Sequence, residues 1–142
     1  MKFIQELPVL VIVIPLIFAL IIPLTGRLNR LIPWIIASTI TFFCFLISIS
    51  LLMTVLDTGR ISYWLGGWEP PWGIEYAVDY LNAFVLVVVS FIAFIVSLYS
   101  KKSIEMEIDE EKISTFYSIY MLFITGLMGI VITGDVFNIY VF

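Results

Sequence analysis

The chain has 142 residues, of which 62% are hydrophobic and 13% charged, and its formal net charge is −4. A soluble domain is nearer half apolar and about a quarter charged, so a single water-soluble core could not hide this much apolar surface, and lipid must be the solvent for most of it. The sequence shows no basic patch with interleaved aromatic residues, which excludes nucleic acid as a partner.

Four runs without charged residues are each long enough to cross a bilayer as a helix, since a hydrocarbon core of about 30 Å needs roughly 20 helical residues. They cover residues 7–26, 31–56, 80–100 and 113–134. The first run is predicted to be retained rather than cleaved, because Glu6 interrupts the segment that a signal peptide keeps basic. A fifth apolar run, 136–142, is too short to cross. We therefore predict an all-α integral protein of the cell membrane, a single multi-pass domain over 1–142 with four spans and the start of a fifth.

Lys and Arg in the short connections predict the orientation, because cytoplasmic loops are enriched in these residues. The N-terminal tail and the loop at 57–79 share one side of the membrane and contain two basic residues, Lys2 and Arg60. The other two loops share the opposite side and contain five, namely Arg27, Arg30, Lys101, Lys102 and Lys112. This imbalance predicts that the N-terminus and the 57–79 loop face outside.

The loop at 57–79 is rich in aromatic residues and in residues that favour turns. Gly66-Gly67 and Pro70-Pro71 interrupt regular helix, and amphipathic rings favour the headgroup zone of a membrane. The rings are those of Tyr63, Trp64, Trp68, Trp72 and Tyr76. This composition predicts an outer interfacial hairpin or lid over the spans. A ligand site is the alternative, but no residue type in the loop demands one.

Two kinds of candidate functional residue lie in the fourth span or just before a span. Gly126, Gly129 and Thr133 fall at spacings of three and four, which predicts a helix face that packs closely against another helix or, alternatively, lines a water path. Asp79 and Asp135 stand just before the third span and the fifth apolar run. A carboxylate there caps a helix or, alternatively, lies at the mouth of an ion pathway.

The sequence lacks the residues that an enzyme or a complete ion pathway needs. It has no histidine and a single cysteine, Cys44, so it predicts no catalytic triad, no metal site, no disulfide and no cofactor. Inside the four spans no side chain is ionisable, whereas ion pathways through lipid use buried acids, Lys or His. We therefore expect that this chain alone is not an enzyme and holds no complete ion pathway.

Two stretches of the sequence resemble a known family. The first is GGWEPPWGI at 66–74 with VDYLNA at 78–83, and the second is TGDVFNIYVF at 133–142. They resemble the outer loop with the third helix, and the segment that opens the fifth helix, in the D-type antiporter-like subunits of Mrp cation/proton antiporters. Related subunits occur in respiratory complex I and in archaeal membrane-bound hydrogenase and sulfane-reductase complexes.

The resemblance implies a topology with the N-terminus outside, in agreement with the imbalance of basic residues. It also implies a longer helical subunit, whose proton path uses a Glu in the fifth helix and a Lys in the seventh. The sequence ends at Phe142, before either residue, so neither role is carried over. Of the family's pattern, Asp79 and Asp135 match.

The leading hypothesis is a truncated antiporter-like subunit with a packing role in a multisubunit membrane complex that moves protons or sodium. Its partners would be lipid and the other membrane subunits, with the complex redox-linked if it is of the hydrogenase or sulfane-reductase type. The usage of Ile and Glu and the absence of His favour that archaeal type, with a plain Mrp antiporter as the alternative. Further alternatives are a split transporter completed by another chain, and an unrelated four-span assembly protein.

Overall fold

The computed structural model describes residues 2–26, 29–64, 67–68, 72–73, 75–134 and 139–140, with side chains from residue 6 onward. Within these residues it contains four long helices, α1 (Lys2–Thr25), α2 (Leu31–Thr58), α3 (Tyr80–Glu107) and α4 (Ile113–Ile132). All four are long and apolar enough to cross a membrane, so the predicted multi-pass class is confirmed. The predicted start of a fifth helix at 136–142 lies almost entirely outside the described residues.

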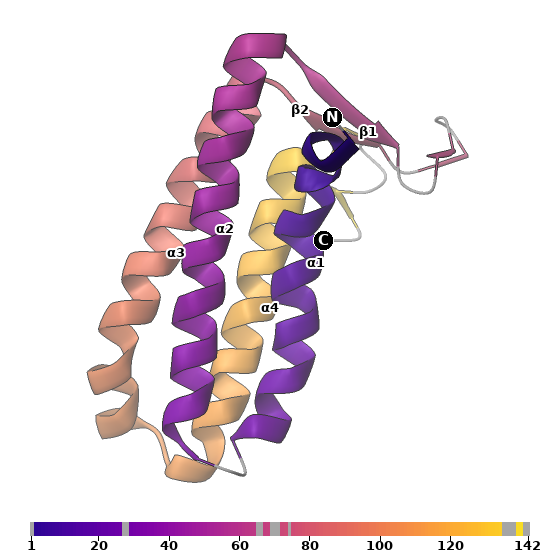
Figure 1. Cartoon of the computed structure of the whole chain (residues 1–142). Helices are drawn as coiled ribbons and strands as arrows, with labels where there is room; N and C mark the ends of the chain where they lie inside the picture. The colour runs from indigo at the N-terminus through magenta and orange to yellow at the C-terminus, as the bar shows by residue number, and fades with distance from the viewer. Residues whose placement is uncertain are drawn as a thin grey trace.

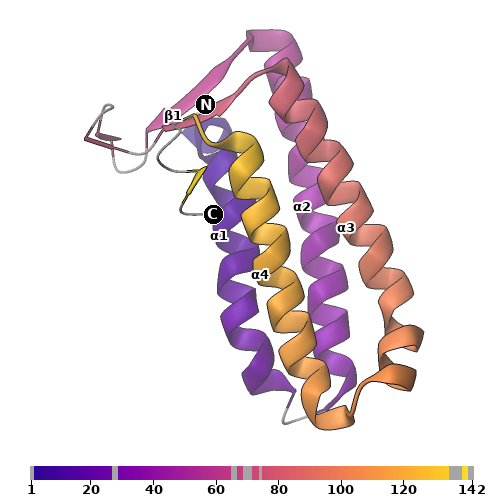
Figure 2. The same cartoon turned by 180° about the vertical axis from the view of Figure 1, so that it is seen from behind.

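The helices run side by side as one bundle (Figure 1). Each helix has two close neighbours: α1 and α3 both contact α2 and α4. The α1–α2 and α3–α4 connections lie at one end of the bundle, and the start of α1 and the end of α4 lie at the other end (Figure 2). The connections predicted to share one side of the membrane therefore do lie at the same end of the molecule.

The connection end of the bundle is charged. Helix α3 continues past its uncharged run, through Lys101 to Glu107, because Lys, Glu and Met all favour helix. The Lys101 ammonium lies 4.5 Å from the centroid of the Trp34 ring, close enough for a cation–π contact. A short 3-10 helix, η2 (Glu110–Lys112), leads into α4, and Arg30 forms an ion pair with its first residue.

A two-stranded antiparallel sheet covers part of the opposite end. Strands β1 (Ile61–Trp64) and β2 (Glu75–Val78) pair with Ile61 opposite Val78 and Trp64 opposite Glu75. Both strands contain the β-branched and aromatic residues that favour this conformation. Figure 1 shows the sheet beside the N-terminal end of α1. The all-α class thus describes the spans, while the loop between α2 and α3 adds a hairpin to it.

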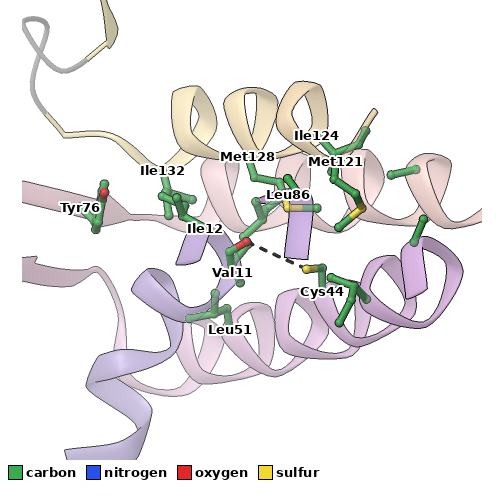
Figure 3. Packing of buried hydrophobic residues seen from close by; sticks show 14 of the residues in the cluster. Val11, Ile12, Cys44, Leu51, Tyr76, Leu86, Met121, Ile124, Met128 and Ile132 are labelled. Carbon is green, nitrogen blue, oxygen red and sulfur yellow. Dashed lines mark hydrogen bonds between the residues drawn. The ribbon is translucent and has the colours of Figure 1, made fainter. Parts of the chain in front are cut away.

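A row of mostly small residues lets α3 pack closely against its neighbours. These buried residues recur at spacings of three and four, and all but one are Ala or Ser: Ala83, Leu86, Ser90, Ala93, Ser97 and Ser100. Larger side chains such as Leu86, Met121 and Met128 fill the space between helices (Figure 3). Cys44 is 1% exposed, with its Sγ 4.0 Å from the Val11 carbonyl oxygen, so it packs as a small apolar side chain.

Helices α1 and α4 meet most closely near the connection end. Gly26 lies against Ser114, and a Cβ added at Gly26 would lie 2.6 Å from the Ser114 Oγ and closer still to its Cβ. One turn further along α4, the Ser118 hydroxyl donates a hydrogen bond to the Ala19 carbonyl. Small residues therefore allow this contact, as expected for helices that pack without a hydrophobic driving force.

Candidate functional site

Asp79 is the N-cap of α3. Its side chain accepts a hydrogen bond of 2.9 Å from the Asn82 backbone N–H, and its carbonyl accepts one of 2.9 Å from Ala83. The Asn82 side chain in turn donates to the Ala77 carbonyl at 3.0 Å. These bonds fix the turn from β2 into α3 and supply partners for donors that a helix start otherwise leaves unpaired. The Asp79 carboxylate remains at the exposed surface.

Strand β2 also binds the chain where α4 ends. Thr133 forms a β-bridge with Tyr76, and the Gly134 N–H donates to the Glu75 carbonyl at 2.9 Å. A Cβ at Gly134 would lie 2.9 Å from the Ala77 Cβ, so glycine allows this close approach. Asp135 comes next in the sequence and lies outside the described residues.

One strand therefore connects both stretches that carried the sequence resemblance. The last residue of β2 immediately precedes Asp79, and its first two residues hold the backbone at Thr133 and Gly134. We call this arrangement, formed by β2, Asp79, Thr133 and Gly134, the β2 junction. It places the entry to Asp135 at the same end of the bundle as Asp79. The β2 junction is therefore the candidate site for any functional role of Asp79 and Asp135.

Sequence reasoning missed two residues of this junction. The Glu75 carboxylate lies 3.8 Å from the Arg60 guanidinium, and its side chain is only 21% exposed. The Tyr76 side chain is buried, and burial raises the pKa of its phenol, so the ring stays neutral. An acid inside an otherwise apolar strand is the signal that could have identified Glu75.

The two glycines of α4 lie in different surroundings. Gly129 is buried inside the bundle, and the N–H of Thr133 bonds to its carbonyl at 3.0 Å. Gly126 is half-buried and lies among large exposed apolar residues. Those residues are Ile119, Leu122, Phe123 and Ile130, which we call the α4 outer face. The two glycines share a helical spacing, but Gly129 packs within this chain whereas Gly126 lies at its surface.

Buried hydroxyl groups connect three helices near the connection end. Thr41 of α2 lies 3.1 Å from the Ser97 hydroxyl of α3, and Ser100 of α3 lies 3.0 Å from the Tyr117 hydroxyl of α4. The Trp34 indole donates to the Ser97 carbonyl at 2.9 Å. We call Thr41, Ser97, Ser100 and Tyr117 the hydroxyl cluster. Sequence reasoning missed it, although the serines three residues apart on α3 were visible.

The described residues offer no metal site. Within 2–26, 29–64, 67–68, 72–73, 75–134 and 139–140, no three His, Cys, Asp or Glu side chains stand close enough together to hold a metal ion. The groups that the structure does bring together are caps, ion pairs and hydroxyls. This chemistry suits packing and hydrogen bonding.

The chain is similar to components of two kinds of membrane complex. It is 31% identical over 141 residues to NADH-quinone oxidoreductase subunit N of Desulforudis audaxviator, covering 96% of this chain and 27% of that protein. It is 31% identical over 134 residues to the D-type component of the Na(+)/H(+) antiporter of Bacillus subtilis, covering 94% and 26%. Over nearly its whole length the chain is similar to one part of these longer subunits. It spans about a quarter of the length of these relatives, and no protein-family model matches it.

Solved structures of two membrane complexes contain chains with the same fold. A chain of the membrane-bound sulfane sulfur reductase, an archaeal respiratory membrane complex, superposes with a TM-score of 0.87 at 28% identity, covering 96% of this chain and 27% of that one. A chain of the Mrp complex from Dietzia sp. superposes with a TM-score of 0.83 over 99% and 25%. Its identity of 19% shows the fold alone. The fold of the described bundle therefore recurs within longer chains of larger membrane complexes.

Proposed function

We propose that this chain packs against other membrane subunits in a multisubunit ion-translocating complex and has a structural role there. The relatives are subunits of antiporters and of an oxidoreductase, which supports an assembly of this class. The uncharged interiors of the four runs support a packing role, because a chain without ionisable groups in lipid lacks the residues that conduct protons. On this proposal the chain catalyses no reaction by itself.

The α4 outer face is the observation that carries this proposal. Its four large apolar residues are between 43% and 61% exposed, and Gly126 has no side chain to fill the space beside them. On this proposal the missing side chain leaves room beside these apolar residues. Small residues at such positions let the backbone of a second helix approach closely, which is how membrane helices associate. A partner helix from a neighbouring subunit fits this surface.

Gly126→Leu is expected to remove the chain from its complex. Leucine would fill this room and keep a partner helix at a distance, while membrane insertion stays unchanged because leucine is favourable in lipid. Co-migration of the tagged chain with the intact complex in mild detergent measures the loss. Ile119→Leu on the same face is the matched control and should co-migrate normally, because it conserves volume. Normal co-migration of Gly126→Leu would refute the packing role of this face.

The proposed orientation puts the hairpin outside and the charged end in the cytoplasm. In a Cys44→Ala background, a cysteine at Ser62 of β1 should react with an impermeant thiol reagent in intact cells. A cysteine at Ser103, near the connection end of α3, should react only after the membrane is opened. The expectation follows from the five-to-two distribution of Lys and Arg. Labelling at Ser103 but not at Ser62 in intact cells would reverse the orientation.

A second candidate function is that of one part of a larger transporter. It is supported by the chain's coverage of only 26–27% of its curated relatives. In this case another polypeptide, or further sequence, supplies the remaining helices with their ionisable groups, and the β2 junction lies at the boundary. Co-expression with such a partner would then produce cation-dependent proton movement in vesicles, whereas a purely structural chain would leave the partner's transport rate unchanged.

A further inference from the structure

Ser38 of α2 is a buried hydroxyl that differs from the others on its helix. It is 8% exposed, and of the buried side-chain nitrogen and oxygen atoms in the described part of the chain, its Oγ is the one without a hydrogen-bond partner. Helical Ser and Thr commonly donate to the carbonyl four residues earlier. On the same helix, Thr41 does so to Ala37 at 2.8 Å and Ser48 to Cys44 at 2.7 Å.

The position of Ser38 on α2 places it beside the hydroxyl cluster. Trp34 and Thr41 both bond to Ser97 of α3, so the side of α2 that carries them faces α3. Ser38 follows Trp34 by four residues and precedes Thr41 by three, which puts it on the same side of the helix. A buried polar atom beside a hydrogen-bonded network is where an ordered water is expected in proteins.

Counting hydrogens in the cluster shows which atoms can still bond. Ser100 donates to the Ser97 carbonyl at 2.8 Å, so Tyr117 must donate in its contact with Ser100. The Ser97 hydroxyl donates to the Phe94 carbonyl at 2.7 Å, so Thr41 donates to the Ser97 hydroxyl or to a carbonyl of its own helix, that of Ala37 at 2.8 Å or of Ser38 at 3.1 Å. Each hydroxyl has one hydrogen and two lone pairs. Under every assignment, at least one lone pair of the Thr41 Oγ1 remains unused.

We propose that Ser38 and Thr41 hold a buried water molecule that extends the hydroxyl cluster. Side chains three residues apart on a helix have Cβ atoms about 5–6 Å apart, and two O–H···O bonds of about 2.8 Å span that separation. The water accepts the hydrogen of Ser38 and donates to the unused lone pair of Thr41. Its second hydrogen is available to a carbonyl or to the Ser97 hydroxyl. A continuous polar layer then joins α2, α3 and α4 inside the apolar bundle.

The ligand of this site is neutral. A cation would bind the neutral hydroxyl oxygens of Ser38 and Thr41, which carry no charge to balance its own. No carboxylate belongs to the cluster, and the acids of α2 and α3 lie at the helix ends, at Asp57, Glu105 and Glu107. A buried charge without a counter-charge is strongly disfavoured. A water molecule can bond to both hydroxyls without the free-energy cost of burying a charge.

Thermal unfolding of the purified protein in mild detergent tests the site. Ser38→Ala removes the hydroxyl that donates to the water and should lower the midpoint by about 2–4 °C. Ser48→Ala is the matched control, since it removes another buried hydroxyl of the same helix that already bonds to a carbonyl, and it should change the midpoint less. If Ser38 were dry, its replacement would remove an unsatisfied group and raise the midpoint or leave it unchanged, which would overturn the proposal.

A double-variant cycle tests whether Ser38 and Thr41 share the water. Thr41→Val removes the acceptor, and once Ser38→Ala has released the water, the second change should cost less than it does alone. Additive shifts in the midpoint would overturn the bridge, because independent sites add. The midpoint of the unaltered protein should be the same in sodium, potassium and choline chloride at equal ionic strength. A higher midpoint in sodium or potassium chloride alone, lost in Ser38→Ala, would show that the site binds a cation instead of water.

Discussion

Gly26→Ala is expected to lower the stability of the bundle by about 1–3 kcal/mol, the usual cost of overpacking. The added Cβ would lie 2.6 Å from the Ser114 Oγ and still closer to the Ser114 Cβ. Rotation of a side chain cannot relieve the second overlap, because a Cβ is fixed to its own backbone. The contact between α1 and α4 must therefore widen. The midpoint of thermal unfolding in detergent measures the loss.

A compensating change separates this overlap from other effects of the substitution. Ser114→Gly removes the Cβ that the new methyl group meets, so the double variant should regain much of the stability that Gly26→Ala loses. Alanine is also a better helix former than glycine, so helix propensity predicts the opposite sign at Gly26. A Gly26→Ala protein as stable as the original, or a double variant less stable than both single variants, would contradict the close contact.

The number of helices and their approximate positions were predictable from the sequence, because the chain must bury about 20 apolar residues for each crossing of the membrane. This length can be recognised in the uncharged runs of the sequence without knowing how the helices pack. Helix ends were less predictable. α3 reaches Glu107, beyond its uncharged run, because charged residues that favour helix extend it past the apolar zone. α2 also ends two residues past its uncharged run, at Thr58.

The packing partners of each helix were not predictable in the same way. Gly126 and Gly129 have the spacing of a contact face, but spacing does not say whether the contacting helix belongs to this chain or to another one. The structure places Gly129 inside the bundle and leaves Gly126 beside exposed residues. Gly26, where α1 meets α4 most closely, gave no signal, because it ends a run and has no second glycine at helical spacing.

The β2 junction and the hydroxyl cluster depend on contacts between residues far apart in the sequence. The bond between Gly134 and Glu75 joins the end of α4 to a loop that precedes α3. Neither residue carries a local pattern that indicates the other. Asp79 differs in this respect, because the cap involves Asn82 and Ala83, its near neighbours in sequence. The cap at Asp79 could therefore be predicted from its neighbours in sequence, whereas the contacts of Thr133 could be found only from the three-dimensional structure.

The 142-residue chain alone is expected to move no protons or sodium across a membrane. A carrier must offer an exchangeable charge or a polar coordination shell inside the bilayer, because an unassisted charge there is strongly disfavoured. The four uncharged runs contain no Asp, Glu, Lys, Arg or His side chain. The hydroxyl cluster provides oxygens on three helices, but the hydrogens of Ser97 and Ser100 bond to α3 carbonyls, and beyond Thr41 on α2 the buried Cys44 packs against Val11. The polar layer therefore ends inside the bundle.

Reconstitution tests this expectation directly. The purified chain is placed in liposomes containing a pH-sensitive dye, and sodium or proton gradients are imposed, with an ionophore to show that the dye responds. The dye signal should match that of empty liposomes. Asp135→Asn is the informative variant, because Asp135 follows the β2 junction and matches the family pattern, so it is the acid best placed at a pathway mouth. A cation-dependent signal from the original chain that Asp135→Asn abolishes would make this chain a transporter in its own right.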